Sequence, residues 1–176
     1  PDGAALSLGG RRFTFHDTAG HARHHVCIHD EGSGHVFAGD TFGLSYRELD
    51  EGDRQFVLPT TSPVQFEPEP YHRSIDLVAR LARGAVYVTH YSQLRDVADI
   101  AARLHRLVDA HAELARAERA AGDARHERLR AGVERIVREE ARRHGGAAAE
   151  ARALDAYAMD IELNAQGLEA RLDTLG

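Results

Sequence analysis

Two histidines and one aspartate stand where strand-like runs of the sequence end. His21 follows Gly20 in a turn, Asp40 follows Gly39, and His90 closes a valine-rich run. Neutral imidazoles and carboxylates are the ligands of hydrolytic metal centres, which also keep one position open for water. A carboxylate has two oxygens and can bridge two cations. The alternatives are a turn histidine bonded to backbone, an aspartate that caps a turn, and a strand-end histidine with an ordinary hydrogen bond.

Three short strands joined by two turns are predicted for residues 13–41. Phenylalanines alternate with polar residues at 13–16, and the same two-residue period returns at 26–28 and 35–38. The Gly/Ser turn at 31–34 predicts a hairpin. A further hairpin is predicted upstream, around Gly9 and Gly10. Cys27 falls in the middle of a strand, which indicates a small core residue.

The order of these motifs resembles that of a known family. Gly20-His21, His25-Val26, a hairpin, Phe37-Ala38-Gly39-Asp40-Thr41 and, much later, Ala85-Val86-Tyr87-Val88-Thr89-His90 resemble the central and late motifs of the metallo-β-lactamase fold hydrolases. The resemblance spans roughly residues 5–95. It implies three metal ligands in this chain, namely His21, Asp40 and His90.

The resemblance also implies a fold: α/β, the C-terminal half of a four-layer αβ/βα sandwich with a helical C-terminal extension. The family's first motif, His-x-His-x-Asp-His, is absent from the sequence, and the chain begins at Pro1. We therefore expect the C-terminal half of a longer protein, inactive alone, with a missing N-terminal half as its partner. Residues 1–93 would form the half-domain and residues 94–176 the extension. A half-sandwich would leave one face uncovered, so we expect aggregation, dimerisation through that face, or a retained partner fragment.

The second half of the chain is predicted to be helical. A proline-rich loop over 56–70 leads to a helix with Pro70 in its first turn and Gly84 as its C-cap, and then to a buried strand at 86–88. From residue 94 onward three amphipathic helices are predicted, without strands, interrupted at Gly122 and at Gly145-Gly146. Such helices either pack on each other and on the α/β part or form a substrate lid or dimerisation arm.

Several neighbours of the predicted ligands are candidates for supporting roles. By resemblance His25 supports the site without binding metal, and Asp17 could orient an imidazole. Phe42, Tyr46 and Tyr91 follow predicted ligands and either line a substrate pocket or pack in the core.

Asp160 and Asn164 share one helix face, for which the sequence favours solvent exposure over a pocket role. His29 and His35 flank the hairpin turn and are expected to be exposed.

Composition limits the possible partners. The net charge is −6 and every fixed positive charge is an arginine, which argues against nucleic-acid binding. No apolar run reaches the roughly 18 residues of a membrane helix. The single cysteine suits a reducing compartment, so we expect a cytoplasmic protein that acts on a small-molecule substrate. A homo-oligomer is compatible with these features.

The function implied by the resemblance is metal-dependent hydrolysis of an ester, thioester, lactone or phosphoester. A dinuclear site with two zinc ions is expected, and iron is possible because histidine and carboxylate ligands do not separate the two metals. No catalytic residue other than the ligands is assigned within this chain. Two alternatives stay open: an iron-dependent oxidoreductase of the same fold, of the sulfur dioxygenase or diiron type, and a non-catalytic assembly protein with a degenerate site.

Overall fold

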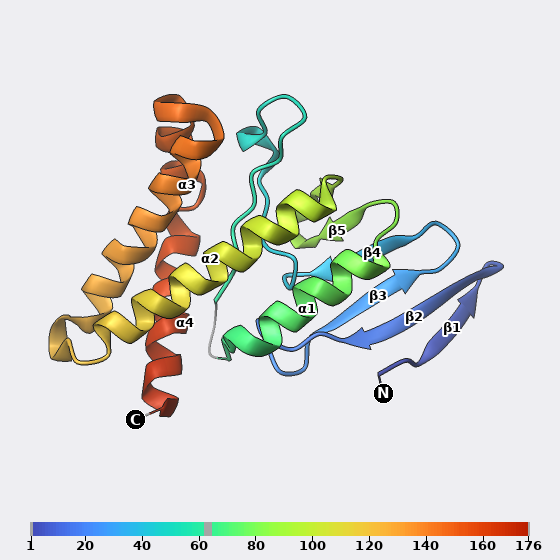
Figure 1. The fold of residues 1–176 in the computed structure, drawn as a ribbon, viewed down its shortest axis with the longest axis horizontal. Coiled ribbons are helices and arrows are strands. Elements are labelled where there is room, and N and C mark those ends of the chain that lie inside the picture. The colour runs from blue at the N-terminus through green and yellow to red at the C-terminus, as the bar shows by residue number, and fades with distance from the viewer. Residues whose placement is uncertain (1, 62–64, 176) are drawn as a thin grey trace.

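One β-sheet forms the centre of the molecule. The computed structural model describes residues 2–61 and 65–175, and within them six strands pair in sequence order (Figure 1). All neighbouring strands are antiparallel except β4 and β5, which are parallel. The strands are β1 (Ala5–Leu8), β2 (Arg11–Asp17), β3 (Val26–Asp30), β4 (His35–Gly39), β5 (Val86–Val88) and β6 (Gln93–Leu94). The predicted α/β class and both predicted hairpins are confirmed.

Helix α1 (Pro68–Leu81) crosses between the two parallel strands and covers one face of the sheet. Parallel neighbours need such a crossover because a tight turn cannot join them. The helix begins at Pro68, so Pro70 lies in the first turn as predicted. The prediction for Gly84 is wrong: Ala82 is the C-cap, and the Gly84 N–H donates to the carbonyl of Gly34 instead.

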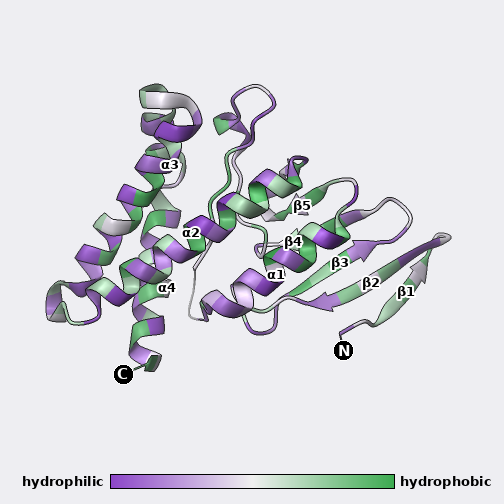
Figure 2. Cartoon of the chain, viewed as in Figure 1, coloured by the Kyte–Doolittle hydropathy of each residue, from purple (hydrophilic) through white to green (hydrophobic). Residues whose placement is uncertain are grey.

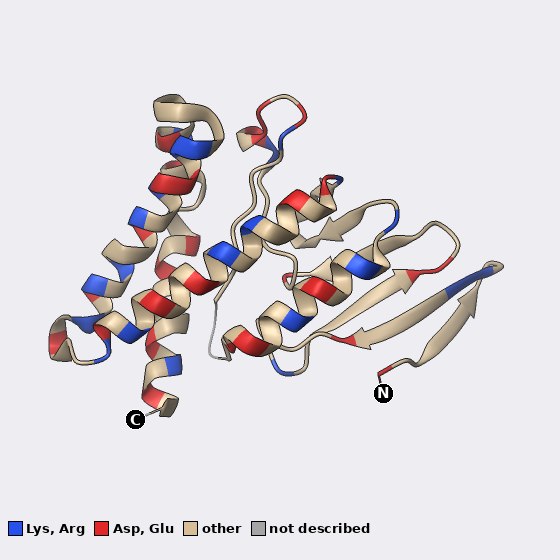
Figure 3. Cartoon of the chain, in the orientation of Figure 1, with Lys and Arg blue, Asp and Glu red and all other residues tan. Residues whose placement is uncertain are grey.

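Three further helices form the C-terminal part: α2 (Val97–Glu118), α3 (Arg125–Ala156) and α4 (Ala158–Leu175). Helix α2 packs against α1, and α3 and α4 pack against each other and against α2 (Figure 1). The predicted interruptions are present, since Gly122 has a positive φ and Gly145 and Gly146 are non-helical within α3. Charges of both signs are interspersed along these helices (Figure 3). No helix among the described residues combines the length and apolarity needed to cross a membrane.

The expectation that no strand follows residue 93 is wrong. Leu94 pairs with Val86, so β6 extends the sheet by one short strand before α2 begins. Leu94 is fully buried, and burial of its side chain stabilises this two-residue edge strand. The division of the chain after residue 93 stays a prediction. The proline-rich loop is described only in part, because residues 62–64 lie outside the described ranges.

The two faces of the sheet differ in burial. Alternate residues Val36 and Ala38 of β4 are buried on the side that α1 covers, whereas Phe37 points to the opposite side and is 41% exposed. That opposite side carries a shallow apolar hollow, and Figure 2 shows hydrophobic residues along the same strands. We call it the open apolar face; its residues are Leu6, Leu8, Phe13, Phe15, Ile28 and Phe37.

Several polar side chains are buried under the helices. Cys27 is fully buried as predicted, and burial raises the pKa of its thiol to about 11. His29 was expected to be exposed, but it is buried because it alternates with Ile28 and so faces the helix-covered side. His111 of α2 is also buried, and its Nδ1–H donates to the Leu107 carbonyl at 2.7 Å. Burial lowers the pKa of His29 and of His111.

Because several histidines are buried, we predict that the free energy of unfolding falls in mild acid. A histidine with a lowered folded-state pKa is protonated first in the unfolded chain, so stability is lost as the pH falls below the unfolded value of about 6.5. Urea unfolding between about pH 7 and pH 5 should show a falling free energy of unfolding, with each buried histidine contributing up to about 1.4 kcal/mol per pH unit. His111→Leu should reduce this pH dependence. An identical dependence in the variant would contradict the prediction.

Candidate metal centre

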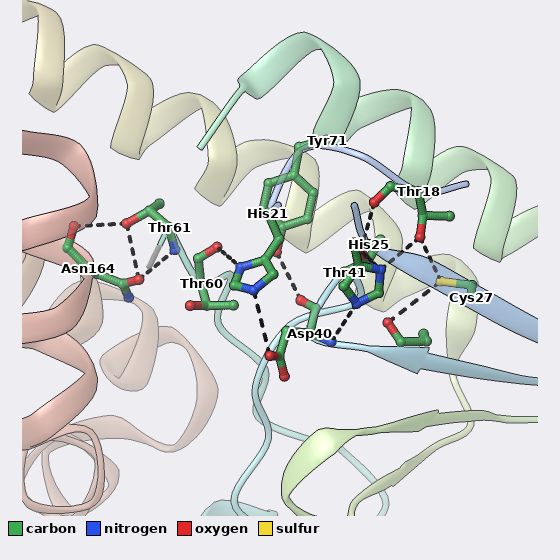
Figure 4. Close-up of polar contacts among 11 residues, drawn as sticks. Thr18, His21, His25, Cys27, Asp40, Thr41, Thr60, Thr61, Tyr71 and Asn164 are labelled. Atoms are coloured by element: carbon green, nitrogen blue, oxygen red, sulfur yellow. Dashed lines mark hydrogen bonds and ion pairs between the residues drawn. The ribbon is translucent and has the colours of Figure 1, made fainter. Parts of the chain in front are cut away.

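The structure brings His21 and Asp40 together beyond the end of the sheet. His21 Nε2 lies 3.6 Å from Asp40 Oδ2 (Figure 4). His21 is buried, and 30% of the Asp40 side chain is exposed, so the pair lies at the border of the interior. Gly20 allows this position because a Cβ there would lie 2.3 Å from the Tyr71 Cα of helix α1. The turn before His21 is therefore held against the helix.

The hydrogen bonding of His21 leaves one ring nitrogen free for a cation. His21 Nδ1 lies 3.4 Å from the Thr60 carbonyl oxygen, which can only accept, and this contact favours the ring proton on Nδ1. Nε2 then presents a lone pair to the Asp40 carboxylate. Burial lowers the pKa of His21, against the opposing effect of the Asp40 charge, and this disfavours a second ring proton. Two facing acceptors repel unless a cation lies between them.

The donor atoms of the pair fit a metal ion. Two ligand atoms 3.6 Å apart can bind the same zinc ion through bonds of about 2.0–2.2 Å. Asp40 Oδ1 is buried and has no hydrogen-bond partner among the described residues. A buried carboxylate oxygen without a partner is costly, and a cation would satisfy it. His21 and Asp40 are therefore suited to hold a cation.

His25 supports Asp40 from the other side of the β4 end. The Asp40 N–H donates to His25 Nε2 at 3.3 Å, and His25 Nδ1 lies 2.8 Å from Thr18 Oγ1 and 2.9 Å from Thr41 Oγ1. Burial lowers the pKa of His25 to about 4, so the ring is neutral near pH 7 and can accept at Nε2. This contact suits the supporting role that the resemblance implies, and the role itself stays a prediction.

His90 does not join the pair. It lies in the turn after β5 with φ of 68°, is exposed, and has its ring 6.0 Å from that of Tyr46. Within the described ranges no three His, Cys, Asp or Glu side chains are grouped so that they could hold a metal ion. The structure thus brings together two of the three predicted ligands. A ligand role for His90 stays a prediction.

The other predicted site residues differ in burial and in what they contact. Asp17 is exposed at the end of β2, where its N–H donates to Asp2, and no contact with an imidazole is present in the described part of the chain. Phe42 is fully buried in the core, which favours the packing alternative. The side chain of Tyr91 lies outside the described residues. Tyr46 is half-buried, and its hydroxyl donates to Asp160 at 2.8 Å.

Helix α4 contributes two residues for which the sequence favoured solvent exposure. Asn164 is only 3% exposed and bonds to Thr61, and Asp160 is half-buried beside Tyr46. The expectation of exposure is wrong because the helix face that carries both residues lies against the loop after β4. Their spacing of four residues indicated a shared face, but it did not indicate what that face contacts.

Comparison with known proteins gives matches of structure only. No family model matches the sequence, and no curated protein matches it. An archaeal metallo-β-lactamase superfamily protein from Sulfolobus tokodaii matches with 26% identity over 59% of this chain and 36% of its own length, with a TM-score of 0.48. A metallo-β-lactamase family protein from Thermus thermophilus matches with 23% identity over 90% and 48%, with a TM-score of 0.49.

A β-lactamase domain protein from Burkholderia ambifaria gives a similar result, with 22% identity over 92% of this chain and 47% of its own, and a TM-score of 0.49. The chain thus spans less than half the length of each of these three proteins. The first two are named as metallo-β-lactamase proteins, and the third is named as a β-lactamase domain protein.

The close approach of β4 to His25 can be tested at Gly39. Its φ is 51°, and a Cβ would lie 2.5 Å from His25 Nε2. Gly52 has a similar φ of 63° but nothing within 4 Å of a Cβ. Gly39→Ala should therefore lower the free energy of unfolding by about 1–3 kcal/mol more than Gly52→Ala, because only the first adds an overlap to the backbone strain. Urea unfolding measures both, and equal losses would contradict the contact.

Proposed function

We propose that this chain carries part of the metal centre of a metal-dependent hydrolase of the metallo-β-lactamase fold. The single observation that carries the proposal is His21 Nε2 facing the Asp40 carboxylate at 3.6 Å while Nδ1 faces the Thr60 carbonyl. His21 and Asp40 would hold the cation, and His90 would join as a ligand of a second ion. Zinc is the metal we expect, and iron would favour the oxidoreductase alternative.

A divalent cation at this position would supply Lewis acidity and a water ionised near neutral pH. The chain's own residues prepare the site for it. The Thr60 carbonyl holds the proton of His21 on Nδ1, and His25 fixes the backbone of Asp40. Substrates of this chemistry are small molecules with an ester, thioester, lactone or phosphoester bond.

We further propose that an N-terminal half of the same protein completes the site and covers the open apolar face. Three observations support this: the sequence lacks a His-x-His-x-Asp-His string, only two of its predicted ligands meet, and the open apolar face has Leu8 67% exposed. An exposed apolar patch of this kind is typical of an interaction site. For the intact protein we propose a cytoplasmic location, since a single cysteine suits a reducing compartment.

Metal content and hydrolysis test the proposed function. The polypeptide extended upstream to include the missing histidine motif should contain zinc and hydrolyse at least one member of a panel of esters, thioesters, lactones and phosphoesters. Asp40→Asn should lower kcat/KM by about 100-fold or more because it weakens a metal ligand. The exposed Asp53→Asn is the matched control and should have little effect. Iron with little zinc would favour the oxidoreductase, and absence of both metals would contradict the proposal.

Self-association tests the role of the open apolar face. Without its cover, the 176-residue chain should form dimers or larger species at high concentration, measured by sedimentation velocity. Phe37→Glu places a charge in the face and should shift the chain toward monomer. Met159→Glu is the control, because Met159 is 75% exposed on α4 and is not among the residues of the open apolar face. Equal effects of the two substitutions would contradict the proposed interface.

A further inference from the structure

One ring nitrogen of His21 faces a single peptide group. The carbonyl that His21 Nδ1 faces belongs to Thr60, and the same planar peptide group carries the N–H of Thr61. In a trans peptide these two groups point in opposite directions, so whatever holds the N–H also sets the direction of the carbonyl. A histidine ligand relies on such a carbonyl to keep its free nitrogen aimed at the metal.

Asn164 of α4 holds this peptide group. Its Oδ1 accepts a hydrogen bond from the Thr61 N–H at 2.6 Å, and the Thr61 hydroxyl donates to the Asn164 backbone carbonyl at 2.9 Å. On the other side of Thr60, Asn164 Nδ2 donates to the Pro59 carbonyl at 3.4 Å. The amide therefore brackets Thr60, and Figure 4 shows Asn164, the Thr60–Thr61 segment, His21 and Asp40 in one continuous series.

The position of Asn164 is itself fixed by packing. The side chain is 3% exposed, and its neighbours on α4, Ile161, Ala165 and Leu168, are buried in the core. A buried amide that makes all of these bonds is costly to replace, because its partners would lose hydrogen bonds without gaining water. These hydrogen bonds thus connect α4 to His21, a predicted metal ligand that lies 143 positions earlier in the sequence than Asn164.

We propose that Asn164 is a positioning residue for His21, acting through the Thr60–Thr61 peptide group. It keeps the His21 proton on Nδ1 and leaves Nε2 free for the cation. This inference rests on the proposed function, because it concerns the same metal centre. It gives the helical extension a direct part in that centre, in place of a lid or a dimerisation arm alone.

The ring protonation of His21 tests the inference, and this first measurement needs neither metal nor substrate. Two-bond nitrogen–proton correlation spectra of the 176-residue chain should show the proton on Nδ1 in the wild type. In Asn164→Ala the proton should redistribute toward Nε2, which can then donate to Asp40. A zinc titration followed at the His21 nitrogens should shift to concentrations higher by about ten- to hundred-fold.

Two variants and a control separate positioning from folding. Asn164→Asp keeps an oxygen that can accept from the Thr61 N–H and should retain the wild-type proton position. Asn164→Gln keeps a buried amide but moves its oxygen by one methylene, and it should behave like Asn164→Ala. The glutamine variant replaces the alanine variant in both measurements if the alanine variant does not fold. Gln166→Ala removes an amide from the exposed side of the same helix and should change neither measurement.

The inference is overturned if the wild-type proton is on Nε2, or if a folded Asn164→Ala or Asn164→Gln leaves it on Nδ1. The proposed function can fail separately. A proton position that responds to Asn164, with no zinc bound by any variant or by the extended polypeptide, would contradict the metal centre and leave the Asn164–His21 connection standing. Zinc binding with an unchanged proton position would contradict the inference alone.

Discussion

The candidate site depends on the hydrogen bond between the Asp40 N–H and the ring of His25. This ring is where the turn after β2, the end of β4 and the segment that follows it meet, through Thr18, Asp40 and Thr41. The bond requires an acceptor at Nε2 and therefore a neutral imidazole, which burial enforces. It also requires a glycine before Asp40, because a side chain there would occupy the space of the ring.

The sheet has one covered face and one uncovered face, and the candidate site lies between them. Helix α1 covers one face, and the core beneath it extends into α2, α3 and α4 as one continuous cluster of buried side chains. The other face has no such cover among the described elements and presents phenylalanines and leucines. Asp40 lies at the edge between the two regions, with its backbone carbonyl accepting from the buried Tyr71 hydroxyl and its side chain partly open.

The sequence predicted local features well and distant contacts poorly. Alternation around Phe13 and Phe15 and glycine-containing turns identified the strands, because strand period and turn geometry are properties of short segments. The motif order indicated that His21 and Asp40 would meet. Asn164 could not be assigned, because helical spacing defines a face without naming the loop it contacts. The backbone of His90 is left-handed and its ring lies near that of Tyr46, and its predicted ligand role stays a prediction.

The hydrogen bonds of Asn164 determine when, during synthesis of the chain, the segment around His21 can reach its final arrangement. A ribosome makes the strands and the turn at residue 21 before α4, and domains tend to fold from the N-terminus as they emerge. Until α4 leaves the exit tunnel, the Thr61 amide lacks its partner, so the carbonyl that faces His21 is not yet held in place. Under the proposed role of Asn164, cation uptake at this position would then await synthesis of α4.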